Sequence, residues 1–356
     1  MQRYYAPEDS SLGGLLLDLD DAELAAAAAE LCASPAWYPV GTGGDRVSVI
    51  HLEEADYAAA SFLDERLLER GAPARAIPVA AAAAAGERLA ARAHYIFHVG
   101  HVGSTLISRL IGARPAFFAV REPALLRARG RAPASAAELP LRGLLALLAR
   151  TWRPEQRGVI KLTSFVSEIG REILAASEAP QALLVYARPL AYLRGIFGGP
   201  NSRRESQALA PDRLKRLRQR HPALGSAPPP RFEGEWIAMS WLCEMSALSS
   251  ISQAFAAQVH WVDFDAFLGA PAPGLAAIFG ALGAPTTAAT LEGLLAGPIM
   301  RRYSKAPEHA YDAELRREVL AGADQDFRAE IQAGMLWLAA AGRADATIAA
   351  ILEARG

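Results

Sequence analysis

The chain has 356 residues, of which 52% are hydrophobic, and its formal net charge at pH 7 is −1. This near-neutral charge gives no reason to expect a nucleic-acid or membrane partner, and Cys32 and Cys243 fit no disulfide or metal-ligand spacing, so we expect two buried core thiols. The N-terminus lacks a signal-peptide pattern and the alanine run at 80–85 is too short to cross a bilayer, so a cytoplasmic protein is expected.

Residues 1–90 carry no chemical motif, and we expect them to form an N-terminal extension that caps the main domain. The alanine-rich run Glu23–Leu31 predicts a helix. The apolar spacing within Tyr57–Arg70 also predicts a helix, whereas Val47–Leu52 alternates like a short strand. The extension is therefore expected to be mainly helical, and an independent partner-binding module is the alternative.

From about residue 91, short apolar runs alternate with helical patterns. The runs are Tyr95–Val99, Phe117–Val120, Val159–Leu162, Ala182–Ala187 and His260–Phe264. The helical patterns are Thr105–Ile111, Ala136–Ala149, Phe165–Ala176 and Gly234–Ala256. Such alternation is typical of an α/β fold with a mostly parallel sheet flanked by helices. We expect this domain at residues 91–342 and a C-terminal helix at 343–356, with ligands bound at the carboxyl ends of the strands.

A glycine-rich loop follows the first run. It consists of Gly100, His101, Val102, Gly103, Ser104 and Thr105. A strand, a tight turn and a helix direct unpaired backbone N–H groups and the positive end of the helix at one point, which makes an anion site. Glycines permit positive φ, and the two hydroxyls add donors. A triphosphate loop of the form G-x-x-x-x-G-K-[ST] would carry a lysine, and none is present, so the pattern predicts a site for a 5′-phosphate.

Charged residues stand at the ends of the later strands. Arg121 and Glu122 follow the second run, Lys161 lies within the third, and Arg188 follows the fourth. Because the carboxyl ends of parallel strands share one edge, we expect these groups to lie near the loop. Asp263 and its neighbour Asp265 at the fifth run have no histidine or cysteine cluster beside them. They are expected to cap a helix, and no metal site is predicted.

The stretch His98–Glu122, with its strand, G-x-x-G-S-T turn, Leu-Ile-Ser-Arg-Leu and Arg-Glu-Pro, resembles the P-loop sulfotransferase family. It is most similar to bacterial sulfotransferase-like proteins. The resemblance covers about residues 92–310 and includes Val262–Phe267 and Arg302–Pro307. It implies a P-loop nucleotide-binding architecture and the donor 3′-phosphoadenosine 5′-phosphosulfate. The implied reaction moves a sulfuryl group to a hydroxyl or amine of a small molecule, glycan or peptide, without a metal.

The resemblance also implies roles for individual residues. The Gly100–Thr105 loop would bind the 5′-phosphate, and Glu122 would act as general base. Lys161 would contact the transferring group and replace the missing loop cation. His101 stands where the family usually has Lys or Arg, and as a partly protonated donor it would assist the leaving oxygen. His98, within the strand, is expected to be structural.

The nucleotide's second phosphate is assigned less directly. Arg188 matches the family's ligand of the 3′-phosphate, because arginine contacts phosphate with two donors. The family places a serine eight residues later, where this chain has Ile196. Ser202 or Arg203 in the next loop could substitute for it, and Arg194 is an alternative ligand. A basic segment is expected to cover the nucleotide. It contains Arg301, Arg302, Ser304 and Lys305.

Two other functions remain open from the sequence. A nonenzymatic protein that binds adenosine bisphosphate, or a scaffold on the same fold, is favoured by His101 and by the missing serine. A kinase-like phosphotransferase is opposed by the missing lysine. The many arginines of Arg203–His221 are expected to lie on a solvated helix.

Overall fold

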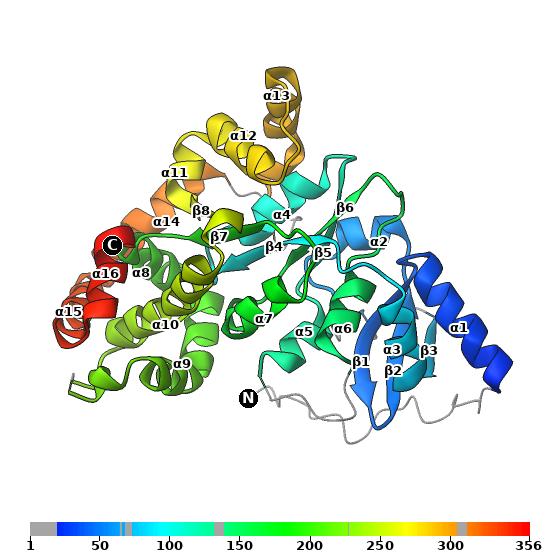
Figure 1. Ribbon diagram of the computed structural model, residues 1–356. Helices are drawn as coiled ribbons and strands as arrows, with labels where there is room; N and C mark the ends of the chain where they lie inside the picture. Colours follow the sequence, from blue (N-terminus) through cyan, green and yellow to red (C-terminus); the bar gives the residue numbers. More distant parts are fainter. Residues whose placement is uncertain (1–19, 65, 68–72, 132–138, 227, 305–311) are drawn as a thin grey trace.

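The computed structural model describes residues 20–64, 66–67, 73–131, 139–226, 228–304 and 312–356 (Figure 1). Its main sheet has five parallel strands in the order β5-β6-β4-β7-β8. The strands are β4 (Ala93–His98), β5 (Phe117–Arg121), β6 (Arg157–Lys161), β7 (Ala182–Tyr186) and β8 (Val259–Asp263). All five expected strands are confirmed, each within two residues of its expected bounds.

The central strand β4 sets the position of the site. All six of its residues are buried, as expected for a parallel strand covered on both faces. The strands that follow β4 directly in the chain lie on one side of it, and β7 and β8 lie on the other. The strand order therefore reverses at β4. In open α/β sheets, ligands bind in the crevice outside the carboxyl end of the strand at such a switch point.

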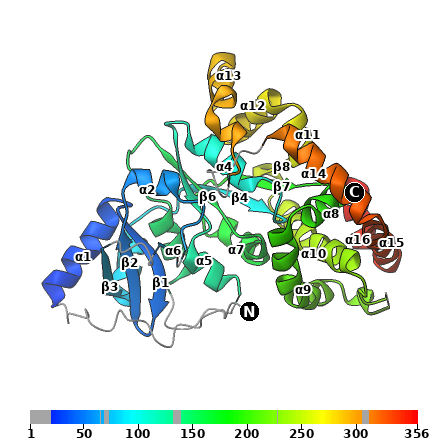
Figure 2. The same ribbon diagram turned by 180° about the vertical axis from the view of Figure 1, so that it is seen from behind.

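Helices cover both faces of the sheet, which confirms the α/β class. They are α4 (Ser104–Gly112), α5 (Ala124–Arg129), α6 (Leu141–Leu148), α7 (Gly170–Ala175), α8 (Pro189–Phe197), α9 (Pro200–Arg220), α10 (Glu233–Ala254), α11 (Phe264–Gly269), α12 (Pro271–Ala281), α13 (Ala288–Ala296), α14 (Ala313–Asp326), α15 (Arg328–Ala344) and α16 (Ala346–Arg355). Short 3₁₀ segments are η2 (Ser164–Ile169), η3 (Pro222–Ser226), η4 (Ala256–Gln258) and η5 (Pro298–Arg301). Figures 1 and 2 show α4 and α12 above the strands and α7 and α10 below them.

The N-terminal region is a small α/β unit. It contains α1 (Asp21–Ala33), β1 (Trp37–Gly43), β2 (Arg46–His51), α2 (Glu54–Ala59), β3 (Ala74–Pro78) and α3 (Val79–Glu87). The helix and the strand expected near residues 23–31 and 47–52 are confirmed as α1 and β2. The helices α1, α2 and α3 make up much of this extension, as expected, whereas β1 and β3, which pair with β2 in an antiparallel sheet, are strands that the sequence did not indicate. The continuous helix expected over residues 57–70 is wrong, since α2 ends at Ala59; residues 65 and 68–70 of that range lie outside the described residues.

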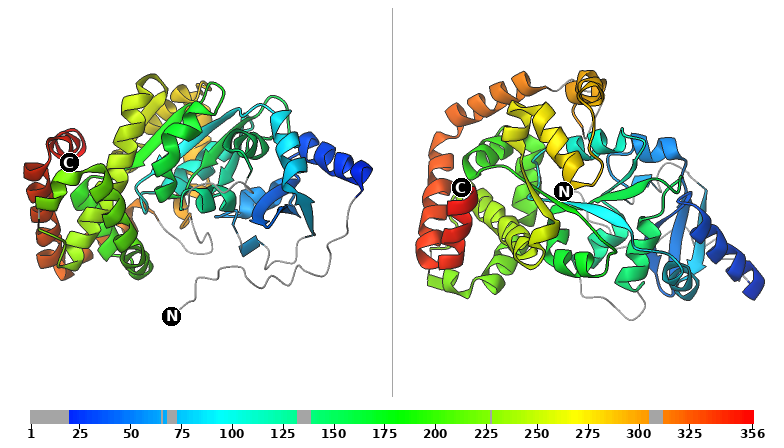
Figure 3. Two further views of the ribbon diagram at one scale, coloured as in Figure 1. Left: turned by 60° about the horizontal axis from the view of Figure 1, so that its bottom comes forward. Right: turned by 45° about the horizontal axis from the view of Figure 1, so that its top comes forward.

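Figure 3 shows the N-terminal unit and the C-terminal helices α15 and α16 at opposite ends of the molecule. The divisions expected after residues 90 and 342 remain predictions. Cys243 is buried and Cys32 partly buried, and both are free thiols. No helix in the described part of the chain has both the length and the apolar character that crossing a membrane requires.

The arginines of α9 correct another expectation. Arg213 is buried and donates to Glu244 of α10 at 2.9 Å. Arg216 binds Glu168 of η2 at 2.6 Å, and Arg220 binds the same carboxylate. This side of α9 is therefore packed into the protein rather than solvated. The acidic partners lie far away in sequence, and the charge run alone gave no indication of them.

Candidate functional site

The loop after β4 has an unusual backbone. Gly100 and Gly103 have φ of +88° and +66°, and His101 between them has φ of +54°. A Cβ on Gly103 would lie 2.0 Å from the ring of Phe264, whereas one on Gly100 would come no closer than 3.7 Å to any atom. Gly103 is therefore required both by its backbone angle and by the space beside it.

His98 holds the start of this loop. Its Nδ1 accepts from the N–H of Gly100 at 2.9 Å, and its Nε2 lies 2.7 Å from the carbonyl oxygen of Leu162. Because a carbonyl can only accept, the ring donates from Nε2 and is in its neutral form. These contacts agree with the structural role expected for His98, which also lines a cavity beside α4.

The N-terminus of α4 faces the loop. Its N-cap is Gly103, which supplies no side-chain cap. The hydroxyl Oγ1 of Thr105 is buried and has no hydrogen-bond partner among the described residues. Leaving a buried polar atom unsatisfied costs about 1–3 kcal/mol. A bound anion would satisfy both this hydroxyl and the free N–H groups of the first helical turn.

A cavity of about 540 Å³ opens beside α4. Residues 101–106, 200–202 and 302–304 line it, together with parts of α8, α11 and α14. Its volume is in the range of ligand pockets, about 300–1,000 Å³. Many of the expected nucleotide-binding residues line it together, although they are distant in sequence. They are His101, Val102, Gly103, Ser104, Thr105, Ser202, Arg302 and Ser304.

Two of these residues, His101 and Ser202, are hydrogen-bonded to each other. The Nδ1 atom of His101 lies 3.0 Å from the hydroxyl of Ser202. Its Nε2 atom lies 3.4 Å from a carboxylate oxygen of Glu205, one turn further along α9. His101 therefore links the loop after β4 to the N-terminal end of α9, on the wall of the cavity.

The wall of the cavity also carries a positively charged side chain that the sequence did not indicate. Arg316 of α14 lines it, and its guanidinium donates to Asp265 at 2.8 Å and lies 5.0 Å from the ring centre of Phe264. Arg316 follows the segment covered by the resemblance, and no motif surrounds it. Asp312, also on the wall, accepts from two backbone N–H groups and caps α14.

Some expected nucleotide ligands lie elsewhere. Arg188 is at the N-cap of α8, its side chain is 68% exposed, and it contacts Asp263 at 3.4 Å without lining the cavity. Arg301 is exposed at the end of η5, and Lys305 lies outside the described residues. The assignment of Arg188 to a 3′-phosphate stays a prediction. The capping role expected for Asp263 is confirmed, since it accepts from two N–H groups of α11.

The expected base and the expected cation bind each other. Lys161, at the end of β6, is fully buried and donates to Glu122, which follows β5. The second carboxylate oxygen of Glu122 accepts from the hydroxyl of Thr163 at 3.0 Å. The pair does not line the large cavity. It lies on the β6 side of the loop, next to the Leu162 carbonyl that binds His98.

Comparison with solved structures finds sulfotransferases. A sulfotransferase domain from the curacin biosynthetic pathway is 12% identical, with a TM-score of 0.39, covering 66% of this chain and 89% of its own. The sulfotransferase domain of the Synechococcus PCC 7002 olefin synthase is 14% identical with a TM-score of 0.38, and the match covers 69% of this chain and 94% of that domain. Sulfotransferase STF9 from Mycobacterium avium is 11% identical with a TM-score of 0.35, and the match covers 87% of this chain and 98% of STF9. No protein-family model and no curated protein matches the chain. At these identities and TM-scores the similarity assigns no activity.

No group of three or more metal-ligating side chains is assembled in the part of the chain that the structure describes. The described groups in and beside the cavity are an uncapped helix N-terminus, hydroxyls, a histidine, the two lining arginines Arg302 and Arg316, and a buried Glu–Lys pair. These groups suit an anionic ligand with a reacting centre near the ends of β4 and β6.

Proposed function

We propose that this protein transfers a sulfuryl group from 3′-phosphoadenosine 5′-phosphosulfate to a hydroxyl or amine of an acceptor. One observation carries the proposal: a glycine turn without lysine leads from the central strand to an uncapped helix, where the buried hydroxyl of Thr105 has no partner among the described residues. A donor with a 5′-phosphate and a single transferable group needs fewer cations there than a triphosphate does.

In this proposal the 5′-phosphate binds the first turn of α4. The backbone N–H groups at residues 103–105 and the hydroxyls of Ser104 and Thr105 donate to its oxygens. His101 and Arg302 stand on the same cavity wall as further donors. Hydrogen bonds to charged groups contribute about 1.5–3 kcal/mol each, so a few of them account for micromolar binding.

The transfer step needs a base and a cation beside the loop. Glu122 would accept the proton from the acceptor, and Lys161 would stabilise the negative charge that develops on the transferring group and the leaving oxygen. The acceptor would approach from the β6 side of the loop, where the two side chains meet. The identity of the acceptor, a small molecule, a glycan or a peptide, is set by loops without a recognisable code.

A thermal-shift series tests the donor assignment. Adenosine 3′,5′-bisphosphate at about 100 times its Kd should stabilise the protein by about 2.7 kcal/mol, and AMP and magnesium–ATP should stabilise it less. A larger response to magnesium–ATP would favour a kinase-like phosphotransferase and contradict the proposal.

A nonenzymatic nucleotide-binding protein is the second candidate. It is favoured by the closed Glu122–Lys161 pair and by the absence of Arg188 from the cavity wall. The Glu122→Gln variant separates the two functions: an enzyme keeps nucleotide binding and loses transfer, whereas in a binding protein the wild type itself transfers nothing to any acceptor tested.

A further inference from the structure

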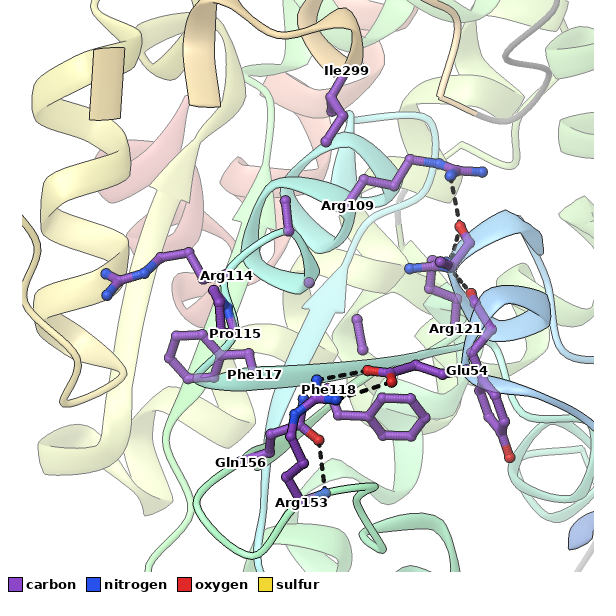
Figure 4. Close-up of a pocket in the computed structure, with 15 residues that line it drawn as sticks. Glu54, Arg109, Arg114, Pro115, Phe117, Phe118, Arg121, Arg153, Gln156 and Ile299 are labelled. Carbon is purple, nitrogen blue, oxygen red and sulfur yellow. Dashed lines mark hydrogen bonds and ion pairs between the residues drawn. The ribbon is translucent and has the colours of Figure 1, made fainter. Parts of the chain in front are cut away.

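A second cleft, of about 370 Å³, lies at the other side of α4 (Figure 4). It is bordered by α2, by the C-terminal end of α4 and by the edge strand β5. It shares no lining residue with the donor cavity. Nothing in the proposed sulfuryl transfer uses it, so its chemistry has to be explained separately.

The charges in this cleft are unbalanced. Its charged lining residues are Glu54, Arg109, Arg114, Arg121 and Arg153. Glu54 binds Arg153 with both carboxylate oxygens, at 3.0 and 2.7 Å. The other three arginines contact no carboxylate among the described residues. The cleft therefore holds an excess of positive charge.

Two of these arginines are close together. The carbonyl oxygen of Ala58, at the end of α2, accepts from Arg109 at 3.0 Å and from Arg121 at 3.2 Å. Arg121 is only 2% exposed, and its burial, followed by the nearby charge of Arg109, lowers the pKa of Arg121 to about 9. Carbonyl dipoles at the end of a six-residue helix carry only partial charge. A full negative charge beside these two guanidinium groups would offset their repulsion.

Most of the remaining lining residues of the cleft are apolar. Figure 4 shows the rings of Phe117 and Phe118 pointing in different directions from β5, with the Phe118 ring on the same side as Arg109 and Arg121. Phe117 stacks on Phe279, whereas Phe118 packs against Tyr57 of α2. Arg114 points away from that pair, so it is not counted as a ligand. The cleft thus combines a hydrogen-bonding cationic corner with aromatic surface, within the size range of small-molecule sites.

We propose that this cleft binds a small organic anion, with its oxyanion group on Arg109 and Arg121 and its apolar body against Phe118. Several donors of the two guanidinium groups are already used, since Arg109 also binds Ala59, Ser61 and Ser304 and Arg121 also binds Tyr57 and Ala60. The Nη1 atoms carry the donors that are left for carboxylate, phosphate or sulfate oxygens. The inference is independent of the proposed transfer reaction, because it uses none of the residues assigned to the donor.

Isothermal titration with phenyl phosphate and with benzoate tests this site, with inorganic phosphate and benzyl alcohol as controls. The variants are Arg109→Gln and Arg121→Gln. Arg171→Gln is the matched control, because Arg171 is an exposed arginine on α7 outside the cleft. Replacing either Arg109 or Arg121 should weaken phenyl phosphate binding at least about 10-fold, which is the effect of losing one charge-assisted hydrogen bond. The Arg171→Gln control should bind phenyl phosphate like the wild type.

A further variant separates the two cavities. Arg109 also donates to the Ser304 carbonyl at 2.9 Å, and Ser304 lines the donor cavity. Thr105→Val alters the donor cavity alone, so phenyl phosphate binding should survive it. The proposal is overturned if the wild type binds neither organic anion below about 10 mM, if Arg109→Gln binds as tightly as Arg171→Gln, or if Thr105→Val abolishes binding. Equal affinity for inorganic phosphate would contradict the apolar contacts. Should Arg121→Gln fail to fold, Arg109→Gln and its control still decide.

Discussion

Replacing Thr105 by valine should stabilise the free protein and weaken its ligand binding at once. Valine keeps the shape of threonine and removes the hydroxyl that is buried without a partner among the described residues. An unsatisfied buried polar atom costs about 1–3 kcal/mol, so the free energy of unfolding should rise by about that amount. The same hydroxyl donates to the bound phosphate in the proposed complex. Its loss should cost about 1.5–3 kcal/mol of binding, or about 10- to 100-fold in Kd.

The assay pairs urea unfolding of the free protein with titration of adenosine 3′,5′-bisphosphate. Ser108→Ala is the matched control, because the Ser108 hydroxyl on the same helix is also buried and unpartnered among the described residues, but does not line the cavity. That variant should also be stabilised, and its affinity should equal that of the wild type. If Thr105→Val is less stable than the wild type, or binds the bisphosphate equally well, then no anion site is formed at this helix N-terminus.

Three further predictions follow from the geometry. Glu122→Gln leaves the buried charge of Lys161 without its carboxylate partner and should lower the free energy of unfolding by about 3–5 kcal/mol. Adding Lys161→Met should restore most of this stability in urea unfolding, and both variants should lose sulfuryl transfer. An unchanged stability of Glu122→Gln would refute the pairing. Gly103→Ala should cost about 1–3 kcal/mol more than Gly100→Ala, since both strain the backbone but only the former clashes with an aromatic ring; equal losses would argue against that clash. Burial, and to a smaller extent the charge of a nearby arginine, lowers the pKa of His94 to about 4. As the pH falls, the unfolded state therefore takes up the proton before the folded state does, and the free energy of unfolding should fall by about 3 kcal/mol between pH 6.5 and pH 4. His94→Asn should lose this acid sensitivity, and a pH profile identical to that of the wild type would refute the assignment.

Much of the fold could be predicted because its main elements have local signals. Parallel strands buried on both faces are continuous apolar runs, and all five were located. The edge strand β1 was missed because Pro39, Gly41 and Gly43 make it unlike a typical strand, although proline is tolerated at a sheet edge. The prediction of a helix that continues beyond Ala59 was wrong, because apolar spacing does not show where tertiary contacts replace helical hydrogen bonds.

The candidate site was predictable where the backbone itself makes it. The loop from Gly100 to Thr105 was located because glycines and hydroxyls at a strand–helix turn have a direct chemical meaning. Arg316 was missed, since it reaches the cavity only through the packing of α14. The ion pair between Glu122 and Lys161 depends on the register of β5 against β6, which the sequence does not fix.

The position of β4 in the middle of the sheet has a consequence for the synthesis of this protein. Tyr95, Ile96 and Phe97 are fully buried in the finished fold, and one edge of their strand pairs only with Ala182–Tyr186. While the ribosome is still producing the residues between, that edge carries unpaired backbone groups on an apolar strand, a template for self-association. A fragment ending at residue 180 should therefore aggregate or remain bound to chaperones, whereas the complete chain closes this edge itself.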